Sequence, residues 1–133
     1  MARRVSGWFR PVTKIRNPFK TPKQEDLPAR RKPEFENMLC EAISKRVQVE
    51  LCYERELITR CFEPYGVYKS TRDKILVAGT QIDNPNKPRD RFKPHNLEVG
   101  KISRLTLTST VFTPDHRFDP TDSRYANGFI CRI

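Results

Sequence analysis

Apolar residues at helical spacing mark the first regular element of the chain. They recur at positions i, i+3, i+4, i+7 and i+8, on one face of a helix: Phe35, Met38, Leu39, Ala42 and Ile43. Pro33 suits the first turn of such a helix, and Glu34 and Glu36 place negative charge where the helix dipole favours it. The pattern predicts one amphipathic helix that begins at Pro33 and ends near Arg46.

From Val47 the apolar spacing changes to two, which is typical of half-buried strands. We expect strands at residues 47–53, 57–63, 74–82 and 101–111, with a short extended piece at 67–69. Pro64 and Gly66 are expected to break the chain, and 83–95, with three prolines and four basic side chains, to form a loop. One helix followed by about five strands predicts an α+β fold, mainly β, with the helix packed on a small barrel or curled sheet.

The two periodicities also predict which side chains form the hydrophobic core. Helix and strand residues on the inward faces should converge: Phe35, Leu39, Ile43, Val49, Leu51, Leu76, Ala78 and Leu105. The segment 113–133 is expected to be a polar tail, held to the body by aromatic and apolar residues such as Phe118, Tyr125, Phe129 and Ile130.

Positive charge is concentrated at one end of the sequence. Residues 1–33, called the N-terminal arm below, hold ten basic and two acidic residues, a net +8, against sixteen basic and fourteen acidic residues in the rest. The arm also holds five of the eleven prolines and shows no sustained period, so we expect an extended segment that orders against a partner or the body. The predicted domains are the arm (1–33), the helix and strands (34–112) and the tail (113–133).

No apolar run approaches the roughly 20 residues of a membrane span, and the N-terminus lacks the apolar stretch of a secretory signal. We therefore expect no membrane partner and a cytoplasmic location. A mitochondrial transit peptide is the alternative, since the first 24 residues contain no acid; Pro11, Pro18 and Pro22 argue against it because they interrupt an amphipathic helix.

The four cysteines, Cys40, Cys52, Cys61 and Cys131, show no CxxC spacing. A zinc site needs paired ligands a few residues apart, and neither His95 nor His116 completes such a set. Reduced, packed thiols are therefore expected, which suits an intracellular compartment. Cys52 and Cys61 could oppose each other across a hairpin, but proximity alone does not make a disulfide.

From Phe35 to about Phe112 the order of features resembles a WYL domain, a ligand-sensing module of bacterial regulators. The features are a helix, a strand that ends Leu51-Cys52-Tyr53, an Arg-containing strand with Arg60, and the turn Glu63-Pro64-Tyr65-Gly66. Lys74-Ile75-Leu76 aligns with the family's Trp-Tyr-Leu, although the two aromatic residues are replaced. Arg91-Phe92, Leu97 and Lys101-Ile102 align with the next signature, with two residues inserted before Lys101.

The resemblance implies a five-stranded Sm-like, SH3-like barrel that binds nucleic acid or a nucleotide-type ligand. Most domains of this kind sit beside a winged-helix domain; no helix-turn-helix precedes this one, so we expect a stand-alone, divergent version. It also implies that Arg60, Arg91, Phe92 and Lys101 face one groove, with Lys93 among the clustered cations of the loop. The loop's alternating cations suit phosphate capture, and the alternative is a loop kept soluble by charge. For Arg60 the alternative is a structural ion pair, with Glu50 as the expected partner.

The arm offers a second route to the same ligand class. Arg3, Arg4 and Arg10 can neutralise phosphates, and Trp8 can stack on unpaired bases. Few histidines, no nucleophile motif and five glycines argue against an enzyme or a bound cofactor. The sequence thus predicts a non-enzymatic regulatory module that binds nucleic acid or a nucleotide. The alternative is an architectural protein whose arm docks in a ribonucleoprotein or other large complex.

Overall fold

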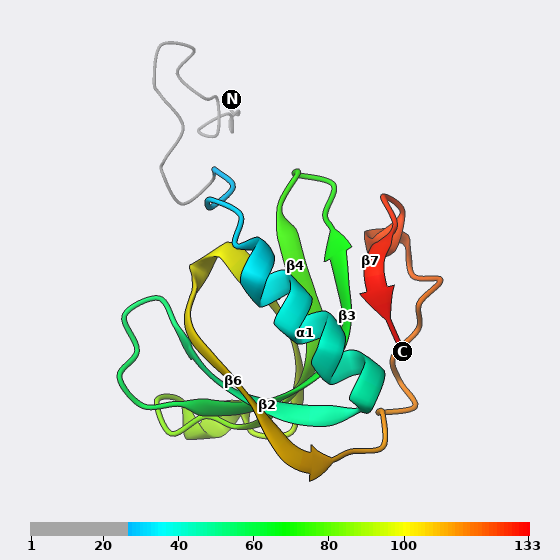
Figure 1. Cartoon of the computed structure of the whole chain (residues 1–133). Helices are drawn as coiled ribbons and strands as arrows, with labels where there is room; N and C mark the ends of the chain where they lie inside the picture. Colours follow the sequence, from blue (N-terminus) through cyan, green and yellow to red (C-terminus); the bar gives the residue numbers. More distant parts are fainter. Residues whose placement is uncertain (1–26) are drawn as a thin grey trace, which may run out of the picture.

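The computed structural model describes residues 27–133, so the predictions for residues 1–26 lie outside it. The elements are α1 (Pro33–Lys45), β2 (Val47–Tyr53), β3 (Arg60–Lys69), β4 (Ile75–Asp83), β5 (Lys93–Glu98), β6 (Ile102–Val111) and β7 (Phe129–Arg132), with short 3-10 helices η3 (Pro88–Asp90), η4 (Val99–Lys101) and η5 (Ser123–Tyr125). The fold is α+β and mainly β, as predicted, and α1 runs diagonally across one side of the sheet (Figure 1).

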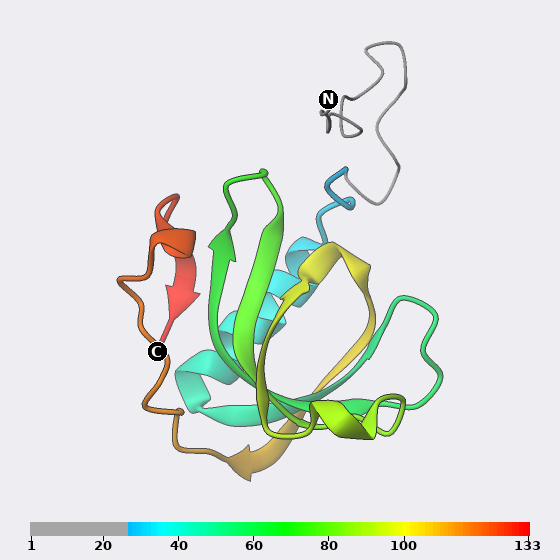
Figure 2. The same cartoon turned by 180° about the vertical axis from the view of Figure 1, so that it is seen from behind.

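The antiparallel sheet has six strands, in the order β5-β4-β3-β2-β6, and β7 also pairs with β3. The predicted closed barrel of five strands is wrong, because β5 and β6 are opposite edges that do not pair. The sheet curls so that these edges meet at one corner (Figure 2). There the Glu54 amide donates to the Lys101 carbonyl at 2.7 Å, and the Glu98 amide donates to the Tyr53 hydroxyl at 3.2 Å.

The main core fills the space between α1 and the curled sheet. Its α1 residues are Leu39, Ala42 and Ile43. Strands β2 to β6 and Val99 of η4 supply the remainder, and the strand residues include Val49, Leu51, Phe62, Val67, Leu97, Ile102 and Leu105. Phe35 packs at its margin, half-buried. Leu76 and Ala78 are not part of the main core. The core residues of β4 are Ile75 and Val77, one position away, so the prediction of which β4 side chains point into the core is wrong.

β3 is one continuous strand where two were predicted. It begins at Arg60, so Leu57 and Ile58 remain in the preceding loop, and it runs through Pro64 and Gly66. Pro64 pairs with Gly79 and Gly66 with Ala78, which leaves Tyr65 as the extra residue of a β-bulge. A bulge tolerates proline in a sheet interior, so Pro-x-Gly marks an irregularity of the strand here and not its end.

The segment after β6, expected to be a polar tail, contributes η5 and β7 and covers the outer face of β3. β7 pairs with Gly66, Val67 and Tyr68, while β2 pairs with the first part of β3. Gly66 permits this pairing, because a Cβ there would lie 2.7 Å from the Phe129 ring. Aromatic rings of both segments pack together: Tyr65, Tyr68, Phe118, Tyr125 and Phe129. Ile130, expected to contact the body, is 48% exposed.

Residues just before α1, assigned from the sequence to the arm, are bound to the body. The Ala29 amide donates to Glu98 Oε2 at 2.7 Å, and Lys32 Nζ donates to the Ile102 carbonyl at 2.6 Å. Arg31 forms a pair of hydrogen bonds with the buried Glu36 carboxylate. The folded body therefore begins before Pro33, and a truncation that spares it should remove residues 1–26.

Cys40 of α1 and Cys131 of β7 form a disulfide, with 5.8 Å between their Cα atoms. The prediction of four reduced thiols is wrong for this pair, while Cys52 and Cys61 are free. Glu50 lies opposite Cys61 in the β2–β3 register, so Cys52 and Cys61 do not face each other. Disulfides are rare in reducing compartments, and the argument from thiols to an intracellular location no longer holds.

The disulfide should stabilise the fold by restricting the unfolded chain, since it joins residues 91 positions apart. We expect reduction of the wild-type chain to lower the free energy of unfolding by about 2–4 kcal/mol, measured by urea denaturation with and without reductant. The double variant Cys40→Ser/Cys131→Ser should match the reduced wild type and show no response to reductant. A response in the double variant would assign the effect to Cys52 or Cys61.

Candidate functional site

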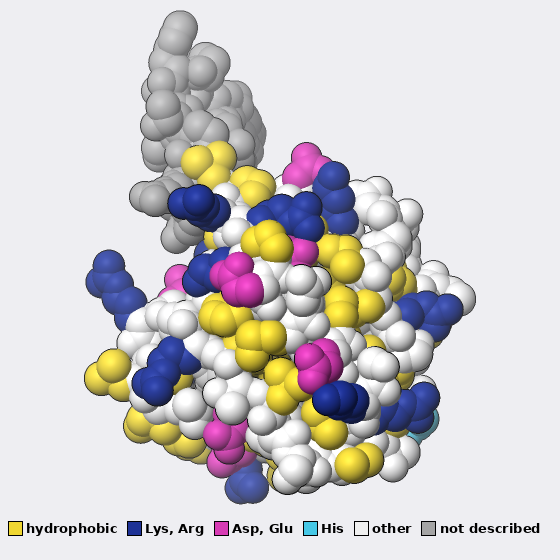
Figure 3. All heavy atoms as spheres, in the orientation of Figure 1, with side chains coloured by type: hydrophobic (Ala, Val, Ile, Leu, Met, Phe, Trp, Pro, Cys, Tyr) yellow, Lys and Arg dark blue, Asp and Glu magenta, His cyan; other side chains and the backbone are white. Residues whose placement is uncertain are grey.

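Two loops at one end of the sheet form an exposed surface that combines cations with apolar side chains. One loop joins β2 to β3 and the other joins β4 to β5; Asn86 Nδ2 donates to the Ile58 carbonyl between them at 3.2 Å. We call this surface the loop patch; its members are Arg55, Leu57, Ile58, Lys87, Arg89, Arg91 and Phe92, all of them exposed. In Figure 3 hydrophobic and basic side chains lie together along the left edge, where the β2–β3 loop projects.

Arg91 and Phe92 form the most distinctive feature of the loop patch. The Phe92 ring is 59% exposed, and the Arg91 guanidinium carbon lies 5.1 Å from the ring centroid. Phe92 has a φ of 59°, a left-handed conformation that is uncommon for a bulky residue. Asp83 Oδ1 lies 3.5 Å from Arg91 Nε and forms an exposed ion pair with it. An exposed ring with a cation over its face is able to stack on a planar ligand.

The loop beneath this pair is held by hydrogen bonds to buried polar side chains. Asn84, fully buried, accepts from the Asn86 amide at 3.0 Å, and Gln81 Nε2 donates to the Asp90 carbonyl at 3.2 Å. Gln81 also lies 3.3 Å from His95 Nε2. Burial lowers the pKa of His95 and Asp90 opposes this in part, while the cations of Arg60 and Lys87 lower it further, so the neutral ring predominates at pH 7.

Arg60 is a buried structural residue and does not point to a ligand. Its Nε donates to Glu56 Oε1 at 3.0 Å, its Nη2 also pairs with Glu56, and its Nη1 donates to Gln81 Oε1 at 2.7 Å. Its guanidinium carbon lies 5.6 Å from the centre of the Tyr53 ring. The structural alternative is therefore the observed one, with Glu56 as the partner in place of Glu50, because the β2–β3 loop folds back over the strand.

The remaining predicted residues do not share one groove. Lys93 is exposed at the start of β5, beside Phe92, whereas Lys101 follows the end of β5 and lies 3.8 Å from Glu98 Oε1. Arg91 and Lys101 thus flank the six residues of β5, roughly 16 Å of strand at 3.3 Å per residue. Arg3, Arg4, Trp8 and Arg10 lie outside the described residues.

Sequence reasoning missed several residues that shape this surface. β5 was not predicted, because its first three residues, Lys93, Pro94 and His95, fall in the expected loop 83–95, although proline is tolerated on an edge strand. Leu57 and Ile58 were assigned to a strand, and their exposure of 89% and 54% comes from the later start of β3. The polar residues Glu56, Gln81 and Asn84 carried no signal, since their role depends on contacts distant in sequence.

Comparisons with known proteins bear on the fold. No family model matches the chain. A segment of 40 residues is 45% identical to Protein MUK1 of Saccharomyces cerevisiae; it covers 30% of this chain and 6% of that protein, so the chain spans a small part of MUK1. Among solved structures, proteasome accessory factor B/C (PafBC) of Arthrobacter aurescens is similar over 70% of this chain and 15% of that chain, with a TM-score of 0.51 and 14% identity.

PafBC is a regulator that contains a WYL domain, so the structural likeness supports a WYL-like fold for this chain. At 14% identity the likeness concerns the fold alone. Within residues 27–133 no helix is long and apolar enough to cross a membrane. The same residues contain no cluster of three side chains suited to hold a metal ion.

The contrast between Arg60 and Arg91 can be measured as stability. Arg60→Ala leaves the Glu56 carboxylate and Gln81 without their buried partner, and we expect a loss of about 3–5 kcal/mol in the free energy of unfolding. Arg91→Ala removes an exposed cation, and the loss should stay under about 0.5 kcal/mol. Chemical denaturation of both variants checks this; equal effects would contradict the structural assignment of Arg60.

Proposed function

We propose that this chain is a non-enzymatic, WYL-like regulatory module that binds single-stranded nucleic acid through the loop patch. The observation that carries the proposal is the Arg91–Phe92 pair: an exposed aromatic ring with a guanidinium 5.1 Å from its centroid, beside further cations. Proteins that bind single strands combine aromatic rings, on which bases stack, with cations that follow the phosphates. We further propose a cytoplasmic location for this binding.

The charge around Phe92 supports the proposal. Lys87, Arg89 and Lys93 are exposed and form no ion pair among residues 27–133, so their charge is available to phosphates. Asp83 and Asp90 reduce the local excess of positive charge, and Asp83 forms an exposed ion pair with Arg91. Leu57 and Ile58 add exposed apolar side chains to the loop patch, which suits unstacked bases better than a duplex backbone.

The N-terminal arm supplies the long-range attraction in this proposal. Residues 1–26 carry seven basic and two acidic residues, a net +5, and add Trp8, Phe9 and Phe19 as stacking candidates. Each phosphate that a cation neutralises releases condensed counterions, so such a segment strengthens binding at low salt whatever the base sequence. In this proposal the arm contributes electrostatic attraction to the binding free energy, and the loop patch contributes stacking on the bases.

The second candidate function is docking in a ribonucleoprotein or other large complex through the arm alone. The observation that favours it is the separation of charge, with +8 in residues 1–33 against +2 in the remainder. On this alternative the loop patch is a solvated surface. Variants in the two regions distinguish the candidates, because only the first function depends on Arg91 and Phe92.

We expect Phe92→Ala to weaken binding of a fluorescent single-stranded oligonucleotide by about 1–3 kcal/mol, the usual contribution of one stacked base, measured by anisotropy. Arg91→Ala should weaken it comparably, with the melting temperature nearly unchanged. Arg72→Ala is the matched control: it removes one exposed cation at the opposite end of β4. If Arg91→Ala and Arg72→Ala reduce affinity equally, charge alone acts and the stacking surface is excluded.

Deletion of residues 1–26 should leave the body folded, because the contacts of Ala29, Arg31 and Lys32 are retained. Salt titrations should show a shallower dependence of log affinity on log salt, by about 0.7 per lost phosphate contact on a single strand. The effect of Phe92→Ala should persist in the truncated chain. Complete loss of binding on truncation, with Phe92→Ala silent in the full chain, would favour the docking alternative.

A further inference from the structure

A cavity of about 190 Å³ lies on the face of the sheet opposite α1, where the C-terminal segment covers β3, β4 and β5. Its floor is Ala78 and Gly79 of β4, and its aromatic wall is Tyr65 and Phe118, whose ring centroids are 5.5 Å apart. Typical pockets for drug-sized ligands start at about 300 Å³, so this cavity suits a small metabolite. The loop patch does not contribute to it.

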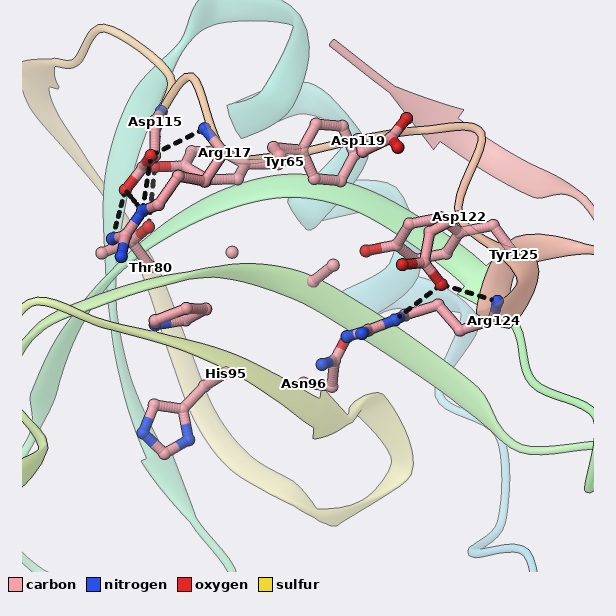
Figure 4. A pocket seen from close by; sticks show the side chains of 14 residues that line it. Tyr65, Thr80, His95, Asn96, Asp115, Arg117, Asp119, Asp122, Arg124 and Tyr125 are labelled. Carbon is pink, nitrogen blue, oxygen red and sulfur yellow. Dashed lines mark hydrogen bonds and ion pairs between the residues drawn. The ribbon is translucent and has the colours of Figure 1, made fainter.

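Two acid–base pairs line the cavity from opposite sides (Figure 4). On one side Arg117 Nε lies 3.1 and 3.2 Å from the two Asp115 carboxylate oxygens and its Nη2 lies 2.7 Å from Oδ2, so this pair is bidentate and engages both carboxylate oxygens. On the other side Arg124 bonds to Asp122 through Nε alone, at 3.1 Å from Oδ1. Asp115 thus uses both carboxylate oxygens within its ion pair, whereas Asp122 uses only Oδ1.

The Asp122–Arg124 pair presents one unused group of each sign. No hydrogen bond within residues 27–133 engages the Arg124 Nη atoms or Asp122 Oδ2, since both Asp122 bonds use Oδ1. The bond from the Arg124 amide to Oδ1, at 2.9 Å, contributes with the side-chain bond to a lowered pKa of Asp122, so the carboxylate is charged at neutral pH. A cation and an anion are thus held side by side at the cavity wall.

Asn96 lines the same cavity as Arg124 and adds a second donor (Figure 4). The Tyr68 hydroxyl donates to Asn96 Oδ1 at 2.8 Å, and no hydrogen bond within residues 27–133 engages Asn96 Nδ2. Burial, with a smaller contribution from Tyr125, raises the pKa of Tyr68 to about 12, so this hydroxyl keeps its proton. Arg124 and Asn96 together form a donor set for a carboxylate, with Asp122 beside them as an acceptor for an ammonium group.

We propose that the cavity binds a free α-amino acid with an aromatic or large apolar side chain. The ligand carboxylate accepts from Arg124 and Asn96, its ammonium donates to Asp122 Oδ2, and its side chain lies on the Ala78–Gly79 floor against Tyr65 and Phe118. A zwitterion matches a wall that carries both charges. A ligand with only a negative charge would be repelled by the neighbouring Asp122 and Asp119 carboxylates, and a ligand with only a positive charge would be repelled by Arg124. The proposal does not depend on nucleic-acid binding by the loop patch.

The test is a titration of the full-length, 15N-labelled chain with L-phenylalanine, followed by amide chemical shifts. Shifts should concentrate at Ala78, Gly79, Asn96 and Arg124. Phenethylamine, which lacks the carboxylate, and 3-phenylpropanoate, which lacks the ammonium, should each bind at least about tenfold more weakly, since each loses a charge-assisted hydrogen bond. L-Alanine should also bind more weakly because it lacks the ring.

Two substitutions test the placement of the head group. Arg124→Gln and Asp122→Asn should each weaken L-phenylalanine by at least about tenfold. Asn at position 122 still accepts from the Arg124 amide, so η5 is retained. Arg72→Gln, in the turn after β3, is the matched control and should bind as the wild type does. Unchanged melting temperatures confirm that the variants are folded.

Three results would overturn the proposal. The first is an absence of amide shifts with any amino acid up to its solubility limit. The second is tighter binding of either single-charge analogue than of L-phenylalanine. The third is a response of the same amides to adenosine or guanosine but not to L-phenylalanine, which would make the cavity a nucleobase site.

Discussion

The β-bulge at Tyr65 is the constraint on which the rest of the structure depends. The extra residue shifts the side-chain alternation of β3, so that Phe62 and Val67 both face the core while Tyr65 faces the opposite side. Tyr65 then anchors both ends of the C-terminal segment: its hydroxyl accepts from the Asp115 amide at 3.0 Å, and its carbonyl accepts from the Ile133 amide at 2.9 Å. Without the bulge, the cavity would lose both its aromatic wall and the segment that covers it.

Helices and strands could be predicted correctly where their apolar residues follow a single period, either helical or alternating. The single stripe of α1 and the alternation of β2 gave correct elements, because each buries one face in the main core. β4 was predicted at the correct place in the sequence, but the wrong side chains were assigned to the main core. Residues Ile75 to Ala78 are all apolar, because the C-terminal segment covers the outer face of β4. A strand buried on both faces has no alternation to read. The disulfide and β7 were beyond prediction because their partners lie far away in the sequence.

The pattern of charged residues indicated which residues make up the candidate site but not how they are arranged in space. Arg60 and Arg91 look equivalent as letters, yet one is enclosed by Glu56 and Gln81 and the other is exposed over Phe92. Burial decides between them, since a buried guanidinium must be paired and an exposed one is available to a ligand. Lys101 illustrates the same limit: its position after β5 removes it from the loop patch, and that separation follows from a strand the sequence hid.

The loop patch and the cavity are joined through β5 and the polar residues behind it. His95 lines the cavity and lies 3.3 Å from Gln81 Nε2, and the same Gln81 nitrogen donates to the Asp90 carbonyl of η3, one residue before Arg91. A ligand that moves His95 therefore acts on the segment that presents Arg91 and Phe92. Such contacts couple the cavity to the loop patch only if this segment has two conformations and the ligand binds one of them more tightly than the other. Where it has them, linkage is reciprocal: nucleic acid on the loop patch changes amino-acid affinity in the cavity by the same factor as the amino acid changes nucleic-acid affinity.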